Sequence, residues 1–364
     1  MADPRYGRSC GSCGRPPIRA AARPHWIGGT TRESRGENCR PHPVPGKRLS
    51  RREGRPRHWL AGWLVACAAL AGTVTRAGDG PVVTFAHRPD ARQVEVGIAG
   101  RPFAVYDYGS KYRKPFFWPV RAADGTVLSR PLLRPGDDHP HHKGLWVAVD
   151  EVNGIDFWAE KGKIVNQHIQ TIPARGDRPA RLKVTNHWQS LDGQTVVRER
   201  TTFSFFPDRM IVLDIELQAV AEQVTFDDTK EGFAGFRMVD SMREREGGHV
   251  VNAEGLTGTK NCWGKTSKWV DYYGPVRGKT YGVTWFDHPG NFRPSRYHVR
   301  DYGLFAISPF GPRAYSKGKL PASPVKLKRG ETLRIRYGFY VHDGDTEQGH
   351  VREAYQRFLR RTAE

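Results

Sequence analysis

Short segments in which apolar and polar residues alternate constrain the fold of this chain more than any other feature. They follow one another from Pro81 onward, are rich in Val, Thr, Tyr and Phe, and are separated by Gly, Asp, Asn or Pro. A period of two places alternate side chains on opposite faces of a strand, one of them in a core. The pattern predicts an all-β, antiparallel fold. The segments are residues 81–87, 93–100, 102–109, 181–191, 195–206, 210–220, 280–288 and 332–342.

We expect one large domain to hold these strands. Residues 78–364 contain no linker, no internal repeat and no strand–helix–strand order of the kind that gives a parallel sheet. Their length exceeds that of a small sandwich and predicts a large double-sheet β-sandwich. One C-terminal α-helix is predicted over residues 346–362, because Val351 and Phe358 belong to an apolar pattern with helical spacing. Thr346 is the predicted N-cap of this helix.

The N-terminal part of the chain differs from the domain in composition. Residues 1–58 are basic and rich in Arg, Pro and Gly, and we expect them to form a disordered leader. Residues 59–77 combine a short apolar core with small residues before a cleavage site after Ala77, as an export signal does. Because a signal peptide stands at a true N-terminus, we expect translation to start near Val44 or Leu49. The prediction is an exported protein, either periplasmic or secreted.

Charge and cysteine content narrow the functional classes. Residues 1–77 hold 15 Lys and Arg against 4 Asp and Glu, so they supply +11 of the formal charge of +20. The basic residues of the mature chain are scattered among acidic ones, which disfavours nucleic-acid binding. Cys262 alone remains after cleavage, so no internal disulfide is expected. Cys67, in the segment LVAC, is the candidate acylated residue if the exported protein is a lipoprotein.

The segment DDHPHHKG concentrates titratable side chains. In an extended backbone His139 and His141 point to one side, and Asp138 and His142 point to the other. Pro140 removes a backbone donor and so favours a strand edge or a loop over a central strand. Two imidazoles on one side are suited to binding a metal or to transferring protons. Taken alone, a surface loop that is merely rich in histidine explains the segment equally well.

Further polar residues are interleaved with Trp, Tyr and Phe in the segments VNGIDFWAEKGKIVNQH, TKEGFAGFRM, NCWGKTSKWVDYYG and WFDHPGNFRPSRYHVRDYGLF. This mixture is typical of a carbohydrate site, because aromatic faces stack on C–H surfaces while polar groups bond to hydroxyls. The glycines around Glu231 and Arg237 permit close backbone approach. The predicted substrate-binding residues are His139, His142, Lys143, Asn153, Asp156, Trp158, Arg237, Asp271, Asn291 and Arg300.

Structural alternatives exist for several of these residues. Glu231 and Arg237 are placed to form an ion pair, and Asp271 and Asp301 are placed to close turns. Large aromatic residues dominate β-sandwich cores, so the core is favoured over a sugar platform for some of them. These aromatic residues are Trp146, Phe157, Trp158, Phe236 and Phe305.

Five blocks of the sequence resemble the bacterial family labelled methane oxygenase PmoA: HPHHKGLWVAVDEVNGIDFW, TKEGFAGFRM, WVDYYG, FDHPGNFR and YHVRDYGLFAISPFG. The resemblance covers about residues 82 to 360. Members are similar to exported soluble proteins and not to the integral-membrane subunit whose label they carry, and the mature chain has no integral membrane domain by sequence. The resemblance implies a supersandwich similar to galactose mutarotase and a role in sugar catabolism. In that broader group a histidine acts as general acid and a carboxylate as general base.

The resemblance and the residue chemistry together predict an exported enzyme that acts on a sugar or sugar derivative as an epimerase, lyase or hydrolase. His141 or His298 is the expected general acid. Glu231 or Asp301 is the expected general base. Arg237 and Arg300 are expected to hold an oxyanion or a carboxylated sugar.

Two other hypotheses remain open at this point. His139 and His141, with His168 or Asp301 as a third group, are suited to binding a divalent metal as the cofactor of an oxygenase-like enzyme. A non-catalytic carbohydrate-binding module would need the aromatic residues but not the titratable cluster.

Overall fold

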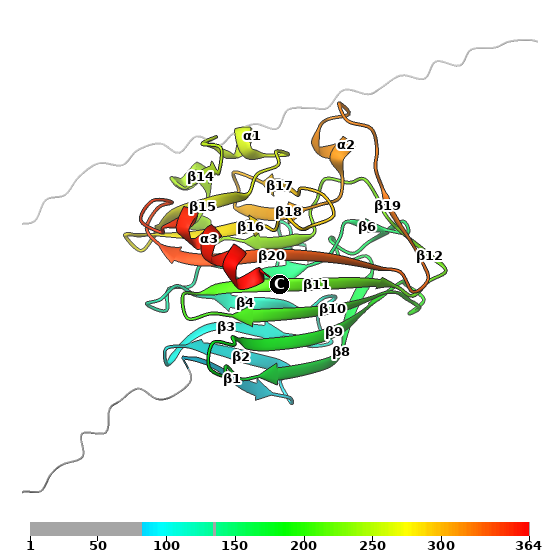
Figure 1. The fold of residues 1–364 in the computed structure, drawn as a ribbon, viewed down its shortest axis with the longest axis horizontal. Helices are drawn as coiled ribbons and strands as arrows, with labels where there is room; N and C mark the ends of the chain where they lie inside the picture. The colour runs from blue at the N-terminus through cyan, green and yellow to red at the C-terminus, as the bar shows by residue number, and fades with distance from the viewer. Residues whose placement is uncertain (1–81, 134–135, 364) are drawn as a thin grey trace, which may run out of the picture. The chain divides into compact units, whose positions relative to one another are not determined.

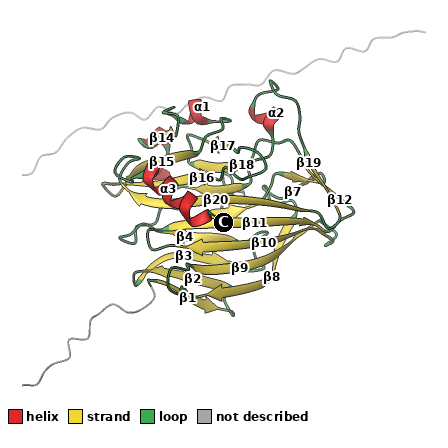
Figure 2. Cartoon of the chain, in the orientation of Figure 1, coloured by secondary structure: helices red, strands yellow, loops and turns green. Residues whose placement is uncertain are grey.

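The described part of the chain is a sandwich of antiparallel sheets (Figure 1). The structure is a computed structural model that describes residues 82–133 and 136–363. The predicted leader, the predicted signal region and Cys67 lie outside these residues. Strands dominate the described part, and only short helices accompany them (Figure 2). The predicted all-β antiparallel class is therefore confirmed.

Two eight-stranded sheets form the two layers of the sandwich. The first sheet consists, in spatial order, of β1 (Val83–Arg88), β2 (Gln93–Ile98), β3 (Arg101–Asp107), β4 (Phe116–Val120), β5 (Leu145–Val147), β13 (Ala234–Arg237), β18 (Leu304–Ser308) and β17 (Arg296–Val299). The second sheet consists of β14 (His249–Asn252), β15 (Trp269–Val276), β16 (Lys279–Asp287), β20 (Thr332–Asp343), β11 (Met210–Ala219), β10 (Thr195–Phe205), β9 (Ala180–Gln189) and β8 (Lys163–Ile172).

A small sheet and short helices complete the described part. The small sheet has the order β19 (Val325–Lys328), β12 (Gln223–Phe226), β6 (Glu151–Val152) and β7 (Ile155–Asp156). The helices are η1 (Asp240–Met242), η2 (Glu244–Glu246), α1 (Thr259–Cys262), α2 (Pro312–Tyr315) and α3 (Val351–Thr362). Within residues 82–133 and 136–363, no helix combines the length and the apolar composition that crossing a membrane requires.

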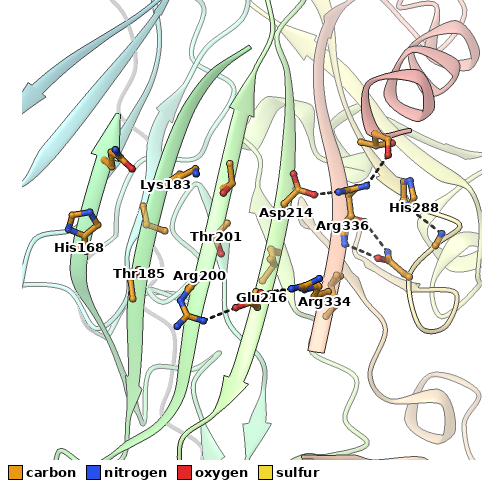
Figure 3. Close-up of a pocket in the computed structure, with 18 of the residues that line it drawn as sticks. His168, Lys183, Thr185, Arg200, Thr201, Asp214, Glu216, His288, Arg334 and Arg336 are labelled. Carbon is orange, nitrogen blue, oxygen red and sulfur yellow. Dashed lines mark hydrogen bonds and ion pairs between the residues drawn. The ribbon is translucent and has the colours of Figure 1, made fainter. Parts of the chain in front are cut away.

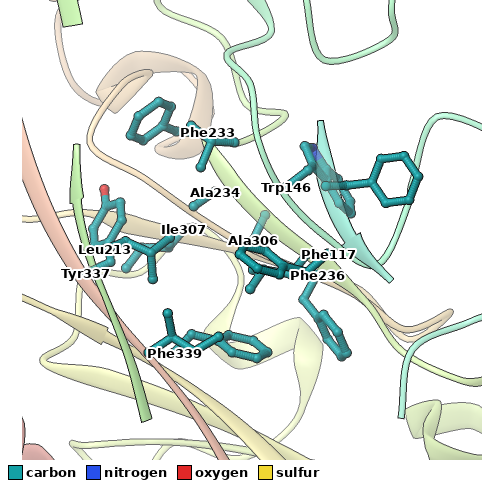
Figure 4. Packing of buried hydrophobic residues seen from close by; sticks show 14 of the residues in the cluster. Phe117, Trp146, Leu213, Phe233, Ala234, Phe236, Ala306, Ile307, Tyr337 and Phe339 are labelled. Atoms are coloured by element: carbon teal, nitrogen blue, oxygen red, sulfur yellow. The ribbon is translucent and has the colours of Figure 1, made fainter. Parts of the chain in front are cut away.

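Aromatic and aliphatic side chains from the inner faces of the two large sheets fill the space between them (Figure 4). The rings of Phe117 and Phe203 have centroids 4.9 Å apart, and those of Phe236 and Phe339 are 5.1 Å apart. Each contact joins a strand of the first sheet to a strand of the second, so these rings fasten the layers together. The five aromatic residues for which the sequence favoured the core are all buried: Trp146, Phe157, Trp158, Phe236 and Phe305.

The eight alternating segments all form strands, namely β1, β2, β3, β9, β10, β11, β16 and β20. The other strands of the two large sheets include the short β5, β13, β17 and β18. A strand of three to five residues that is buried on both faces shows no alternation, so the sequence pattern does not reveal it.

The C-terminal helix begins five residues later than the sequence predicts. Its first residue is Val351, and its N-cap is His350, whose backbone has a positive φ of 49°. Thr346 does not cap the helix, because its hydroxyl donates a hydrogen bond to Asp271 Oδ2 at 2.6 Å. The helix packs on the outer face of the second sheet, where Phe358 contacts Phe286 with ring centroids 5.6 Å apart.

Gly144 fixes the point at which the histidine-rich loop enters β5. Its φ is +52°, and a Cβ atom at this position would lie 2.0 Å from the carbonyl oxygen of Phe117. Neither the backbone conformation nor the space therefore tolerates a side chain. Gly154 has a similar φ of +74°, but a Cβ atom there would meet nothing within 4 Å.

We predict that Gly144→Ala lowers the free energy of unfolding by roughly 3 kcal/mol or more, because left-handed strain and a steric clash add. Gly154→Ala is the matched control and should cost roughly 1 kcal/mol, from the backbone conformation alone. Urea denaturation of both variants measures the difference. Equal losses of stability would show that the contact with Phe117 does not constrain the loop.

Candidate functional site

A row of cross-strand neighbours on the outer face of the first sheet forms the base of the candidate site. Phe116 lies opposite Trp146, Trp146 opposite Gly235, Gly235 opposite Ala306, and Ala306 opposite His298. Because side chains alternate between the faces of a strand, these five residues all project to the side away from the sandwich core. The side chains at both ends of the row are large, and those of Gly235 and Ala306 in the middle are small.

Trp158 covers the small residues of this row. A Cβ atom on Gly235 would lie 2.9 Å from the Trp158 ring and 2.6 Å from the Trp146 ring. A Cβ atom on Gly232 would lie 2.9 Å from both Trp158 and Ala306. The glycines of the segment KEGFAGFR therefore allow two indole rings to lie against the sheet. This is the close approach to the backbone that the sequence predicted.

The three histidines of the segment HPHHKG come together in a loop and not in an extended strand. His139 has a positive φ of 50°, and the His142 amide donates to the His139 carbonyl oxygen at 3.1 Å. The ring of His142 stacks on that of His139 at 4.8 Å and on that of Trp146 at 5.5 Å. The prediction that His139 and His141 share one side while His142 takes the other is therefore wrong, because the chain turns at His139.

Two lysines share one carboxylate beside this loop. Lys143 Nζ lies 2.6 Å and Lys114 Nζ 3.1 Å from Glu160 Oε1. Burial of the Lys114 side chain lowers its pKa to about 8, although Glu160 opposes the shift. Burial, and then the charge of Lys114, lower the pKa of His141 to about 4. His141 is therefore neutral at pH 7.

His298 and Glu231 form the second titratable group, at the other end of the row. The Nδ1–H of His298 donates to the carbonyl oxygen of Lys230. Burial lowers the pKa of His298 to about 4, so at neutral pH the ring is uncharged and Nε2 is a proton acceptor. Burial alone would raise the pKa of Glu231, but the Lys230 hydrogen bond, the protonated form of His298 and the charges of Lys230 and Arg300 lower it overall.

Asp150 and Asp156 extend this group, and the first was not a predicted site residue. Burial, and then the charge of Asp156, raise the pKa of Asp150 to about 6, and Glu231 contributes in the same direction. Burial also raises the pKa of Asp156, which accepts a hydrogen bond from the Ala159 amide at 2.7 Å. We name Asp150, Asp156, Glu231 and His298 the acid–base cluster. Asp150 directly follows the buried run LWVAV, which is the signal that could have revealed it.

Aromatic residues with unpartnered donors adjoin the acid–base cluster. The rings of Trp263 and Tyr315 lie 6.1 and 6.2 Å from that of His298. The buried Trp263 Nε1 and Tyr315 hydroxyl have no hydrogen-bond partner within the described residues, and the same holds for Nε1 of Trp146 and Trp158. Buried donors are normally satisfied, so four of them on one face indicate a place for a polar ligand or for water.

Arg300 and Asp301 lie where the chain turns from β17 to β18. Both are exposed, and together with Trp263 they line a recess of about 390 Å³. Arg300 acts electrostatically on Glu231 and His298. The structure thus places Arg300 next to the acid–base cluster and Asp301 at the rim of the recess.

Three predicted binding residues have structural roles elsewhere. Asn153 bridges two strands of the small sheet, since its Oδ1 accepts from the Thr225 amide at 2.7 Å. Asp271 is fully buried on the second sheet, where His342 Nε2 lies 2.9 Å from Oδ1. Asn291 binds Asp287 and the backbone of β20 with its side-chain amide. Polar side chains with these partners have little capacity left for a ligand.

Glu231 and Arg237 do not pair with each other. Glu231 is ion-paired to Lys230, whereas Arg237 lies at the far end of β13 with Nη2 3.7 Å from Asp138 Oδ2. The predicted structural ion pair is therefore absent from the described residues, and each side chain belongs to a different part of the outer face.

A groove of about 860 Å³ lies on the opposite side of the molecule, on the outer face of the second sheet (Figure 3). Its charged side chains form cross-strand pairs, such as Arg200 Nη1 to Glu216 Oε1 at 2.7 Å. Such pairs are typical of a solvated sheet face. His168 lies in this groove, so it cannot join His139 and His141. Within the described residues no group of three or more His, Cys, Asp or Glu side chains is arranged to hold a metal ion.

The sequence matches the model of a known family. A family model described as a family of unknown function (DUF6807) matches residues 93–356. The matched region lies within the span over which the five sequence blocks resemble one family. The match to this family tests neither the methane-oxygenase label nor export, so both stay predictions. No protein with curated annotation matches the sequence.

Similar solved structures include three at low sequence identity. Galactose 1-epimerase from Lactobacillus acidophilus has a TM-score of 0.40 at 8% identity, with 73% of this chain and 100% of that chain covered. A GalM/aldose epimerase homologue from C. elegans has a TM-score of 0.33 at 8% identity, with 72% and 100% covered. A mutant of heparan sulfate lyase HepC from Pedobacter heparinus has a TM-score of 0.32 at 9% identity, with 74% and 36% covered.

The raised pKa of Asp150 predicts a pH-dependent effect on stability. A carboxyl group with a raised pKa stabilises the fold when protonated, and this contribution is lost as the pH rises through its folded pKa of about 6. Asp150→Asn removes the charge but keeps a hydrogen-bond acceptor. After allowance for solvent screening, we expect the variant to be more stable than wild type by about 1 kcal/mol at pH 8.

At pH 3.5 the wild type and the variant should be equally stable. Asp150 of the wild type is then mostly protonated in both the folded and the unfolded state, so its ionisation no longer affects stability. Urea denaturation at both pH values measures the effect. A variant that is less stable than wild type at pH 8 would contradict the assignment of an uncompensated buried carboxyl group.

Proposed function

The chain belongs to the family of unknown function DUF6807, and we propose that it is an enzyme that acts on a carbohydrate by general acid–base chemistry at the outer face of the first sheet. The observation that carries the proposal is the acid–base cluster itself. Asp150 and Glu231 act on each other electrostatically, yet burial raises the pKa of one while basic neighbours lower the pKa of the other. Neighbouring groups whose pKa values are driven apart are the arrangement that acid–base enzymes use.

The proposed roles are the reverse of those expected from residue type. His298 is neutral, with Nδ1–H held by the Lys230 carbonyl oxygen, so its Nε2 accepts a proton as the general base. Asp150 holds its proton to about pH 6 and donates it as the general acid. Glu231 stays ionised and stabilises the imidazolium that forms on His298 when the base has taken its proton.

The surroundings of the cluster favour a carbohydrate as the substrate. Trp263 lines the adjoining recess with its aromatic side chain, and the unpartnered Nε1–H of Trp263 and hydroxyl group of the buried Tyr315 match the acceptors of a sugar. The adjoining recess of about 390 Å³ is large enough for a monosaccharide unit. Proton removal at one position and proton donation to an oxygen at another are steps shared by sugar epimerases, lyases and glycoside hydrolases.

A turnover screen tests the proposal and separates these three reactions. Change of optical rotation detects epimerisation, ultraviolet absorbance of a new carbon–carbon double bond detects a lyase, and release of reducing ends detects hydrolysis. Binding of sugars without turnover, unaffected by changes in the acid–base cluster, would indicate a non-catalytic binding module instead.

For any substrate found, we predict that His298→Ala and Asp150→Asn lower kcat/KM by roughly 100-fold or more, because each removes one proton-transfer group. His249→Ala is the control, since His249 is exposed at β14 on the second sheet and should leave kcat/KM unchanged. Circular dichroism confirms that the variants fold. Wild-type activity in both cluster variants would remove the assignment.

We also predict a bell-shaped dependence of kcat/KM on pH, with its maximum near pH 5. Activity falls as the pH drops below about 4, because His298 becomes protonated and no longer accepts a proton. Activity falls again as the pH rises above about 6, because Asp150 loses the proton that it must donate. Activity that rises steadily to pH 8 would contradict these roles.

A further inference from the structure

Two arginines lie over the ring of Tyr302 at the end of the first sheet, and two more lie close to them. The guanidinium carbon of Arg237 lies 4.7 Å and that of Arg300 5.8 Å from the centre of the Tyr302 ring. Arg130 is paired to β13 through its backbone, since its amide donates to the Arg237 carbonyl oxygen at 3.0 Å. Arg243 follows η1, and its charge acts on Arg130 and on Arg237. Of these four arginines, Arg300 lines the recess of about 390 Å³ described above. We name the group Arg130, Arg237, Arg243, Arg300 and Tyr302, which extends inward from Arg300, the arginine recess.

The two innermost arginines of the arginine recess are buried, and the carboxylate that they share lies at the long end of ion-pair distances. Arg237 is 1% exposed and Arg130 is 5% exposed. The carboxylate that faces both is Asp138, at 3.7 Å from Arg237 Nη2 and 4.0 Å from Arg130 Nη1, and its side chain is 67% exposed. These distances exceed those of a close ion pair, and water screens so exposed a carboxylate. Asp240, which pairs with Arg243, is likewise exposed at 56%.

Donor groups of the recess are also left over. Arg130 uses Nη1 and Nη2 to hold the histidine-rich loop, by donating to the carbonyl oxygens of Asp138 and His139 at 3.2 and 2.8 Å. Nη1 of Arg237 lies 3.3 Å from His142 Nδ1. The buried Nε atoms of Arg130, Arg237 and Arg243 nevertheless have no hydrogen-bond partner within residues 82–133 and 136–363. Burial, and then the neighbouring Arg130, lower the pKa of Arg237 to about 10, as expected for a cation without sufficient counter-charge.

We propose that the arginine recess binds an oxyanion substituent of the sugar, so that the substrate is an anionic carbohydrate; this inference rests on the proposed function. Planar guanidinium groups bind carboxylate and sulfate oxygens through paired, charge-assisted hydrogen bonds, and free Nε–H groups supply one donor of each pair. An anion in the recess would offset the buried charge and satisfy the leftover donors together.

The position of the recess relative to the acid–base cluster fits one ligand that spans both. Arg300 contacts the Tyr302 ring on one side and acts electrostatically on Glu231 and His298 on the other. His139 stacks on Tyr302 at 5.3 Å and so joins the histidine-rich loop to the recess. A sugar held by its anionic group would therefore present its ring to the proton-transfer groups.

Isothermal titration calorimetry tests the inference directly. The probes are glucuronate and galacturonate as carboxylates, galactose 6-sulfate as a sulfate ester, and glucose and galactose as neutral parents. We expect at least one anionic sugar to bind roughly 10-fold or more tightly than its neutral parent, and to bind more weakly as salt is added. The carboxylate and sulfate arms identify the anion. Equal affinities for the neutral and anionic sugars would overturn the inference.

Variants locate the binding site. Arg243→Gln removes a half-buried guanidinium group. Arg237→Lys keeps the positive charge at the most buried position but loses the planar guanidinium group with its paired hydrogen-bond donors. Each should weaken binding of the anionic sugar by roughly 10-fold or more, and leave binding of the neutral parent unchanged. Arg334→Gln is the control, because Arg334 is exposed on the outer face of the second sheet and pairs with Glu216 there. Loss of affinity in the control but not in the recess variants would refute the assignment.

The outcomes separate this inference from the proposed function. Turnover of neutral sugars with no preference for anionic ones would overturn the arginine recess as a substrate site and leave the acid–base cluster intact. Tight, recess-dependent binding of an anionic sugar without any turnover would support the recess and overturn the enzymatic proposal.

Discussion

The register of five strands of the first sheet is the constraint on which the rest of the site depends. It aligns one residue of each strand, Phe116, Trp146, Gly235, Ala306 and His298, in one row on the outer face. A slip of one residue in any of these strands would exchange its faces and turn an inner ring such as Phe236 toward the solvent. The contact between Phe236 and Phe339 of the second sheet opposes such a slip. The packing of the core therefore fixes the position of the functional side chains outside it.

The outer face of the first sheet carries buried charge that the fold itself does not require. Lys114 and Arg237 are almost fully buried. The charged group that acts most strongly on Asp150 is the carboxylate of Asp156, whereas a basic neighbour would have stabilised its ionised form. Each arrangement costs free energy of folding, because the charged form is removed from water without full compensation. The outer face of the second sheet differs, since its arginines form exposed cross-strand pairs. This contrast, and not groove volume, is the reason for which we place the proposed site on the outer face of the first sheet.

The sequence predicts the long strands but not the assembly of the site. Alternation over ten residues identifies a strand such as β10 or β11, whereas the three-residue β5 carries Trp146 and shows no period. The HPHHKG segment stands out by composition, yet the positive φ of His139 that groups its three rings arises from the loop's contacts. His168 and Asp271 illustrate the complementary failure. Both belong to segments that also contain aromatic residues of the predicted site, but the strands that hold them belong to the second sheet.

Residue type indicates which side chains can transfer protons, but the environment decides in which direction. A histidine near neutral pH is expected to serve as an acid as readily as a base. Burial and the Lys230 carbonyl oxygen leave His298 neutral with a free acceptor above about pH 4, while burial beside Asp156 keeps the proton on Asp150 up to about pH 6. The sequence contains no signal for either effect. Lys230 and Asp156 become neighbours of these groups through the arrangement of β7, β13 and β17 in the folded chain. The exchange of roles that we propose between histidine and carboxyl group thus rests on the fold and not on residue type.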